Sequence, residues 1–125
     1  EPDCILYNGY SYVAPSAVSG NPGSFYRSPY FLFGPDFGTE GVIDHKRRMD
    51  IVFDMFRFKV RIPLNMQTTL FSRGVMEREC DSVFRAPFPD HYLLNALLIS
   101  AEKWVFLPDK LVVVGISPKS FGQFF

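Results

Sequence analysis

Residues 87–103, PFPDHYLLNALLISAEK, predict the helix around which the rest of the domain should pack. Two prolines stiffen the entry, and a first helical turn tolerates proline because its missing N–H would be unpaired there. Beyond Tyr92 the apolar residues recur at helical spacing, so one face should be buried, with Leu94, Leu97, Leu98 and Ala101 on it. We expect Asn95, Glu102 and Lys103 to face outward.

Asp90 falls in the first turn of this predicted helix. A carboxylate there interacts favourably with the positive end of the helix dipole. This position suits a catalytic base presented at the mouth of a cleft. An ordinary aspartate at a helix start is the other interpretation, because acidic residues favour first turns in general.

The length and composition indicate one domain or domain fragment spanning residues 1–125. Hydrophobic residues make up 47% of the chain and aromatic residues 17%, which is enough for a real core. Thirteen basic residues balance thirteen acidic ones, so the net charge favours neither a nucleic-acid partner nor an anionic membrane. No stretch reaches the roughly 18 to 20 apolar residues of a transmembrane segment.

The two cysteines, Cys4 and Cys80, lie far apart and form no metal-binding spacing. We expect free thiols in a reducing compartment, with a single disulfide as the alternative. The chain begins at Glu1 without a signal-peptide pattern and ends on two phenylalanines. Both ends look cut, which suggests a piece of a longer protein.

The first third of the sequence predicts strands followed by a long loop. Cys4–Tyr7 and Tyr10–Val13 have strand character, and Asn8-Gly9 between them is a strong hairpin signal. A single bulged strand would carry the same residues. Residues 14–41 are rich in proline, glycine and aromatic side chains, which predicts an ordered loop lying over the domain. Such a loop either has a function or simply covers the core.

A second helix is predicted over about residues 41–56, with Thr39 or Asp36 near its start. Its expected buried stripe consists of Met49, Val52, Phe53 and Phe56, and its expected exposed basic patch of His45, Lys46, Arg47 and Arg48. The alternation of apolar and basic residues over 56–62 also permits an edge strand. We favour a helix that continues to about Lys59, before Pro63 ends the element.

The remaining elements predict a mixed α/β sheet. Thr68–Phe71 should form a strand and Val75–Cys80 a short helix. Residues 104–107 and 111–114 are almost continuously apolar, as in strands covered on both faces, with a turn at 108–110 between them. The small and hydroxyl residues of 115–122 form a loop that could bind phosphate through backbone N–H groups.

Three stretches then carry a family resemblance: PDCILYNGYSYVAP (2–15), LNMQTTLFSR (64–73) and PFPDHYLLNALLISAEKWVFLPDKLVVVGIS (87–117). In this order they resemble the C-terminal, acceptor-side half of a family 2 glycosyltransferase. The fold class that this implies is α/β, with a partial GT-A-like mixed sheet, flanking helices and no N-terminal nucleotide-binding half.

The resemblance also implies roles for individual residues. Asp90 matches the acidic residue that opens a helix and supplies the catalytic base, and His91 beside it could orient that base. Asn65 and Arg73 match the acceptor-side strand. Each of these is an expectation that depends on the resemblance.

The donor side of the reaction is only partly represented. Lys119 and Ser120 match the C-terminal loop that closes over the diphosphate, but the Asp-x-Asp metal motif is missing. Glu1-Pro2-Asp3 mimics its spacing yet immediately precedes a strand, whereas the family motif lies further upstream. The divalent metal of the parent enzyme, Mn²⁺ or Mg²⁺, would therefore have its ligands outside this chain. We expect this chain alone to be inactive.

The parent function that the resemblance implies is sugar transfer from a nucleotide-sugar donor to the hydroxyl of a saccharide or lipid-linked acceptor. Polysaccharide biosynthesis in the cytoplasm, free or at the inner face of the membrane, fits this chemistry. Aromatic residues of the 25–33 loop could stack on acceptor sugars. Strands whose partners lie in a missing half would also leave open sheet edges, which favour self-association.

Two other classes of function remain open on the sequence. A non-catalytic carbohydrate-binding module would use the same exposed tyrosine and phenylalanine side chains. A small hydrolase would need Asp90, His91 and a serine such as Ser117 or Ser120. The hydrolase is the weaker hypothesis, because no Gly-x-Ser-x-Gly elbow is present and adjacent residues of a helix do not face each other.

Overall fold

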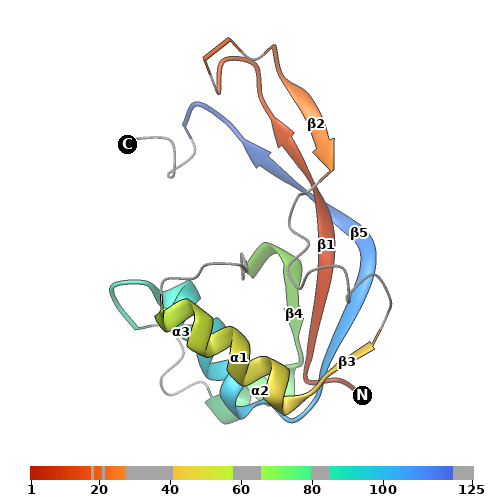
Figure 1. The fold of residues 1–125 in the computed structure, drawn as a ribbon, viewed down its shortest axis with the longest axis vertical. Coiled ribbons are helices and arrows are strands. Elements are labelled where there is room, and N and C mark those ends of the chain that lie inside the picture. Colours follow the sequence, from red (N-terminus) through yellow and green to blue (C-terminus); the bar gives the residue numbers. More distant parts are fainter. Residues whose placement is uncertain (18, 21, 28–40, 58–65, 80–84, 120–125) are drawn as a thin grey trace.

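The described residues form one sheet whose lower half packs against a group of helices (Figure 1). The structure is a computed structural model that describes the chain except for residues 18, 21, 28–40, 58–65, 80–84 and 120–125. The elements in chain order are β1 (Cys4–Val13), β2 (Ser24–Arg27), β3 (Gly41–Ile43), α1 (His45–Phe56), the 3-10 helix η2 (Met66–Thr68), β4 (Thr69–Phe71), α2 (Arg73–Glu79), α3 (Pro89–Ser100) and β5 (Trp104–Ile116).

The sheet is mixed, with strand order β2-β1-β5-β3 and β4 paired to β1. β1 and β5 run parallel along their whole length, while β2, β3 and β4 pair antiparallel to their neighbours. β2 pairs with the second half of β1 and β4 with its first three residues. The predicted α/β class, a mixed sheet with flanking helices, is confirmed.

The parallel pair β1–β5 contains a bulge where the sequence predicts two turns. Tyr7 is opposite Leu107, Asn8 is opposite Lys110 and Gly9 is opposite Val112, so thirteen residues of β5 span ten residues of β1. The Asn8 side chain donates from Nδ2 to the carbonyl of Pro108 at 2.9 Å and holds the bulge. The predicted hairpin at Asn8-Gly9 and the predicted turn at 108–110 are therefore both wrong, and the bulged single strand is correct.

Gly9 is required by the close approach of the two strands. A Cβ atom at this position would lie 2.9 Å from Cγ2 and 3.0 Å from the carbonyl oxygen of Val112. The second contact is with backbone, which a change of rotamer does not relieve. Asn-Gly here thus serves strand packing rather than chain reversal.

The hydrophobic core lies between one face of the sheet and the helices. Alternate residues of the two central strands point inward, namely Cys4, Leu6, Trp104 and Phe106. The helices contribute Ile51 and Val52 from α1, Val75 from α2, and Leu93, Leu94, Leu97 and Leu98 from α3. The buried face predicted for 87–103 is confirmed, whereas Asn95, predicted to face outward, is partly buried.

The upper half of the sheet extends beyond the helices (Figure 1). Leu111 and Val113 are more than half exposed there, at 56% and 57%, so the prediction that both faces of this strand are covered is wrong. The ammonium of Lys110 lies 5.3 Å from the ring centroid of Tyr10. Within the described residues, β5 pairs only with β1 beyond Phe106, which leaves its other edge open.

Helix α1 begins later than predicted. Residues 41–43 form β3, and Asp44 caps the helix by accepting a hydrogen bond from the backbone N–H of Arg47 at 2.8 Å. The suggested start residues Thr39 and Asp36 lie outside the described residues. The helix ends at Phe56 with Arg57 as its C-cap, so the predicted continuation to about Lys59 is wrong at Arg57; residues 58–62, including the alternative edge strand, lie outside the described residues.

The buried face of α1 differs from the predicted one. Arg48, Ile51 and Val52 are buried, while Phe53 and Phe56 are 60% and 73% exposed. Met49 is partly buried against the core, as expected. Arg48, predicted to be exposed, is only 5% exposed because its guanidinium donates from Nη1 to the carbonyls of Leu98 and Ala101.

These contacts complete the C-terminal end of α3. The last carbonyls of a helix lack intrahelical partners, and burying them without donors is unfavourable. The Trp104 indole donates from Nε1 to the carbonyl of Leu97 at 3.1 Å. Arg48 donates hydrogen bonds to the carbonyls of Leu98 and Ala101. A cation at this end also interacts favourably with the helix dipole.

Of the other predicted elements, the strand is confirmed over Thr69–Phe71 and the short helix over Arg73–Glu79. The region 24–27, assigned to a loop, instead forms β2 against β1. Of the rest of the predicted 14–41 loop, residues 14–17, 19–20 and 22–23 lie outside helices and strands, Gly41 begins β3, and residues 18, 21 and 28–40 lie outside the described residues.

We predict that Arg48→Met lowers the free energy of unfolding by about 2 kcal/mol, because two buried carbonyls lose their donor. Arg57→Met removes an exposed arginine of the same region and should change it by less than about 0.5 kcal/mol. Urea denaturation of both variants measures the difference. Equal stability of the two variants would contradict the role of Arg48.

We also predict that Gly9→Ala lowers the free energy of unfolding by about 1 to 3 kcal/mol, because the added methyl group pushes β1 away from β5. Gly115→Ala is the matched control, since a Cβ there meets none of the described atoms within 4 Å. Thermal unfolding of the two variants should therefore differ clearly. A Gly9→Ala variant as stable as the control would show that the bulge adapts freely.

Candidate functional site

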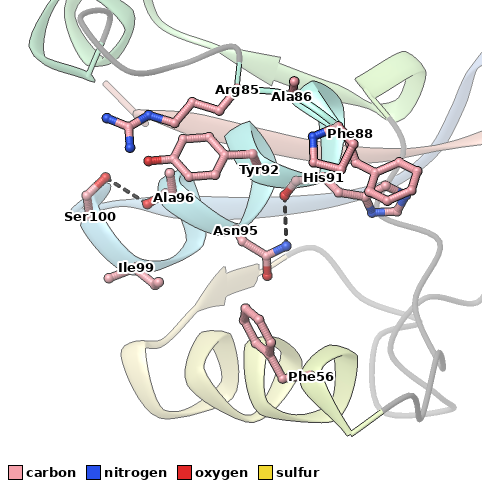
Figure 2. A pocket seen from close by; sticks show the side chains of 11 residues that line it. Phe56, Arg85, Ala86, Phe88, His91, Tyr92, Asn95, Ala96, Ile99 and Ser100 are labelled. Carbon is pink, nitrogen blue, oxygen red and sulfur yellow. Dashed lines mark hydrogen bonds between the residues drawn. The ribbon is translucent and has the colours of Figure 1, made fainter.

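A cavity of about 560 Å³ opens on the outer side of α3 (Figure 2). It is lined by Phe56, Arg85, Ala86, Pro87, Phe88, His91, Tyr92, Asn95, Ala96, Ile99 and Ser100. The residues from α3 recur in pairs four apart, and they alternate with the buried leucines of the same helix. One face of α3 therefore packs on the core while the opposite face forms the cavity wall.

Aromatic side chains dominate this wall. Phe56 from α1 and Phe88 from the start of α3 are 73% and 65% exposed, and the ring of His91 meets Phe88 edge to face with centroids 6.3 Å apart. The Arg85 guanidinium lies over the ring of Tyr92, 5.4 Å from its centroid. Exposed aromatic surface gathered in a concave site is typical of ligand binding.

Asn95 contributes an unpaired acceptor to the cavity. Its Nδ2 donates to the carbonyl of His91 at 2.8 Å, while its Oδ1 is buried and has no hydrogen-bond partner in the described part of the chain. Figure 2 shows this oxygen directed toward Phe56, which projects from α1. Buried polar atoms are normally hydrogen-bonded, so this oxygen indicates a place for a donor.

Asp90 lies in the first turn of α3, as predicted, and its side chain is exposed. It is not part of the cavity wall, although the residues Phe88 and His91 on either side of it are. Its carboxylate forms no hydrogen bond or ion pair within the described part of the chain. At 3.6 residues per turn, Asp90 shares the side of α3 that carries Leu94 and Leu97, opposite the residues that line the cavity. Its exposed carboxylate therefore lies near the cavity in sequence but not in its wall.

His91 belongs to the cavity and not to a pair with Asp90. Its ring packs against Phe88, and no hydrogen bond joins it to the carboxylate of Asp90. Ser117 follows the far end of β5, which lies at the other end of the sheet from α3 (Figure 1). Asp90, His91 and Ser117 are therefore not brought together, and the alternative serine of the hydrolase hypothesis, Ser120, lies outside the described residues.

Two of the other predicted site residues, Arg73 and Lys119, are not among the residues that line the cavity. Arg73 starts α2 and donates from Nε to Glu77 at 2.7 Å in an exposed ion pair. Lys119 is exposed three residues beyond β5, where its backbone N–H donates to the Ser117 hydroxyl at 3.3 Å. Asn65 and Ser120 lie outside the described residues.

Most of the cavity-lining residues could not be predicted from the sequence. The sequence pattern places Phe56 in the core, and it suggests no function for Arg85, Tyr92 or Asn95. One available signal is the outer face of the predicted helix, where Tyr92, Ala96 and Ile99 make an apolar second stripe. A helix that is apolar on two opposite faces has a second surface to cover.

Asp3, which mimics part of a metal motif, has a structural role. Its carboxylate accepts from the backbone N–H groups of Glu102 at 2.9 Å and Lys103 at 3.1 Å, and from Nη2 of Arg78 at 3.1 Å. The hydrogen bond from the Lys103 N–H, with those from Arg78 and Glu102, holds the pKa of Asp3 below its usual value, against the opposing effect of partial burial. This carboxylate ties β1 to α2 and to the α3–β5 connection.

Neither a metal centre nor a reactive thiol emerges from the described residues. They contain no group of three or more His, Cys, Asp or Glu side chains that could hold a metal ion. Cys4 is a free thiol whose complete burial raises its pKa to about 12, so it stays protonated and unreactive at neutral pH. Cys80 lies outside the described residues.

The helices in the described part of the chain are all too short or too polar to cross a bilayer. Comparison of the chain with protein families, curated proteins and solved structures finds no match in any of the three.

We predict that Asp3→Asn lowers the free energy of unfolding by about 1 to 2 kcal/mol at pH 7, because charge-assisted hydrogen bonds are lost. The pKa of Asp3 is lowered in the folded state, so its contribution is complete above the unfolded-state pKa of about 3.9 and is lost as the pH falls through the folded-state value. The difference between wild type and variant should therefore shrink below about pH 4. Denaturant unfolding between pH 7 and pH 2 measures it.

Glu102→Gln is the control for this prediction. It removes a neighbouring carboxylate and keeps the backbone N–H that donates a hydrogen bond to Asp3. It should leave the stability at pH 7 within about 0.5 kcal/mol of wild type. A gap between wild type and Asp3→Asn that stays constant down to pH 2 would contradict the assignment.

Proposed function

We propose that the chain is the acceptor-side part of a glycosyltransferase, in which the cavity beside α3 holds the acceptor sugar and Asp90 is the general base. The observation that carries this proposal is the aromatic cavity wall on α3, the same helix whose first turn holds the exposed carboxylate of Asp90. The resemblance to family 2 glycosyltransferases suggests the reaction, which is transfer of a sugar from a nucleotide-sugar to an acceptor hydroxyl. The mixed sheet with flanking helices is compatible with part of a GT-A fold.

In this proposal the aromatic rings of the wall hold the acceptor, which extends around the N-terminal end of α3 so that its reacting hydroxyl meets Asp90. The carboxylate takes the hydroxyl proton as the oxygen attacks the anomeric carbon of the donor sugar. A bond forms between that oxygen and the anomeric carbon, while the bond to the diphosphate breaks. General-base assistance of this kind typically contributes about 10² to 10⁴ in rate.

Apart from Lys119, the part of the site that would bind the nucleotide-sugar donor is not among the described residues. Asp3 is engaged in backbone hydrogen bonds, so it does not fit the metal role that its position mimics. The Mn²⁺ or Mg²⁺ expected from the resemblance would need ligands beyond the described residues. The roles of Lys119 and Ser120 at the diphosphate, and of Asn65 and Arg73 at the acceptor, stay predictions of the resemblance.

A carbohydrate-binding module is the second candidate, because the same cavity could hold a saccharide without any chemistry. The aromatic wall supports it as well as it supports the transferase. Calorimetry with UDP-sugars and Mn²⁺ separates the two candidates. Nucleotide binding only by a chain extended upstream supports the transferase, whereas saccharide binding without any response to nucleotide or metal supports the module.

We predict that Asp90→Asn, in a chain extended to include the nucleotide-binding half, lowers the transfer rate by about 10² to 10⁴ and leaves donor binding unchanged. Asp109→Asn, an exposed aspartate on β5, is the control and should keep the wild-type rate. Release of UDP from a UDP-sugar in the presence of acceptor measures the rate. Unchanged turnover of Asp90→Asn would overturn the assignment of the base.

A further inference from the structure

We infer that the cavity beside α3 selects a saccharide that carries an anionic group, either a carboxylate or a phosphate. This inference rests on the proposed function, since it names the class of acceptor for the same cavity. It follows from three properties of the cavity wall: its charge, its unpaired acceptor and its aromatic surface.

The charge of the wall is one-sided although the chain as a whole is neutral. Arg85 is the cationic side chain of the wall, and none of the residues lining the cavity is an aspartate or glutamate. Arg85 forms no ion pair within the described residues, and its guanidinium lies 5.4 Å from the Tyr92 ring centroid. A guanidinium placed over an aromatic ring keeps its N–H edge available, and this edge pairs well with carboxylate or phosphate oxygens.

The unpaired acceptor requires that the ligand also donate a hydrogen bond. Asn95 Oδ1 is buried without a partner among the described residues, and one N–H of the Asn95 amide donates to the carbonyl of His91. Sugar hydroxyl groups can donate to this oxygen, and a pyranose presents several of them. The ligand thus combines an anionic group with hydroxyl groups.

The aromatic surface supplies the remaining complementarity. Phe56 reaches from α1 toward Asn95, on the other helix, and Phe88 presents most of its ring to solvent (Figure 2). The C–H face of a pyranose ring covers such rings and removes apolar surface from water. A small inorganic anion leaves them exposed.

The test compares ligands that share the pyranose ring and differ in charge. Methyl glucoside, methyl glucuronide and glucose 6-phosphate are titrated separately into the 125-residue chain, with inorganic phosphate as the ion without a sugar. Binding is measured by calorimetry for the wild type and every variant, and the NMR signals of the Asn95 side-chain amide locate it in the wild type. We expect at least one of the two anionic sugars to bind about tenfold or more tightly than the glucoside, as a charge-assisted pair requires.

Variants assign that preference to named groups. Arg85→Gln should reduce the ratio between anionic and neutral sugar to about one, while Lys46→Gln removes the same charge at the start of α1 and should leave the ratio unchanged. Asn95→Ala should weaken the neutral and anionic sugars by a similar factor. Both arginine and lysine side chains are exposed, so these charge variants are expected to fold.

Each result decides between the inference and the proposed function. Equal binding of glucoside and anionic sugars would overturn the inference and leave the saccharide site intact. Absence of binding by any of the three sugars would overturn both. Inorganic phosphate binding as tightly as glucose 6-phosphate, with no binding of the glucuronide, would mean an adventitious ion only and would overturn the inference. Tight binding by one anionic sugar alone supports it and identifies the anion.

Discussion

The C-terminal end of α3 is the point on which the described core depends. Its carbonyls are buried, and they accept hydrogen bonds from Trp104 on β5 and from Arg48 on α1. These two donors join the central sheet, the first helix and the last helix at one place. Because buried carbonyls without donors are unfavourable, this arrangement sets the rotation of α1 about its axis as well as the depth of α3 in the core. Asp3 closes the same region from outside, by binding the backbone N–H groups of the α3–β5 connection.

The candidate site is a consequence of that arrangement. With Arg48, Ile51 and Val52 turned inward, α1 presents Phe56 to solvent, where it becomes part of the cavity wall. The four buried leucines occupy one face of α3, so the opposite face with its apolar and aromatic residues is left for the cavity. Asp90 lies in the first turn of the same helix and does not line the cavity. The geometry of the proposed acceptor site therefore depends on hydrogen bonds made at the other end of the helix.

Predictions from local sequence patterns are correct for a helix whose own residues specify it. They are wrong where contacts with residues distant in the sequence determine the structure. Helix α3 and its buried leucines follow from periodicity, because apolar spacing and the proline entry act within one segment. Asn8-Gly9 and residues 108–110 each resemble a turn, yet they lie opposite each other in a parallel pair and form a bulge. The close contact of Gly9 with Val112, more than 100 residues away, explains the glycine better than any local preference. Likewise, the buried face of α1 could not be predicted from its sequence. A charged arginine is buried only when carbonyls from distant residues accept hydrogen bonds from its guanidinium.

The sequence by itself determined the α/β class, the helix of residues 89–100 with its inward leucines, and the position of Asp90 in its first turn, since each follows from spacing within a short segment. Only the tertiary structure decided that Arg48 is buried, that Phe56 lines a cavity, that Asp3 ties strands to helices, and that Lys119 follows the opposite end of the sheet from α3. These features come from pairs of groups far apart in the chain. Such pairs are specified by packing and by the need to satisfy buried polar atoms, which no local pattern records.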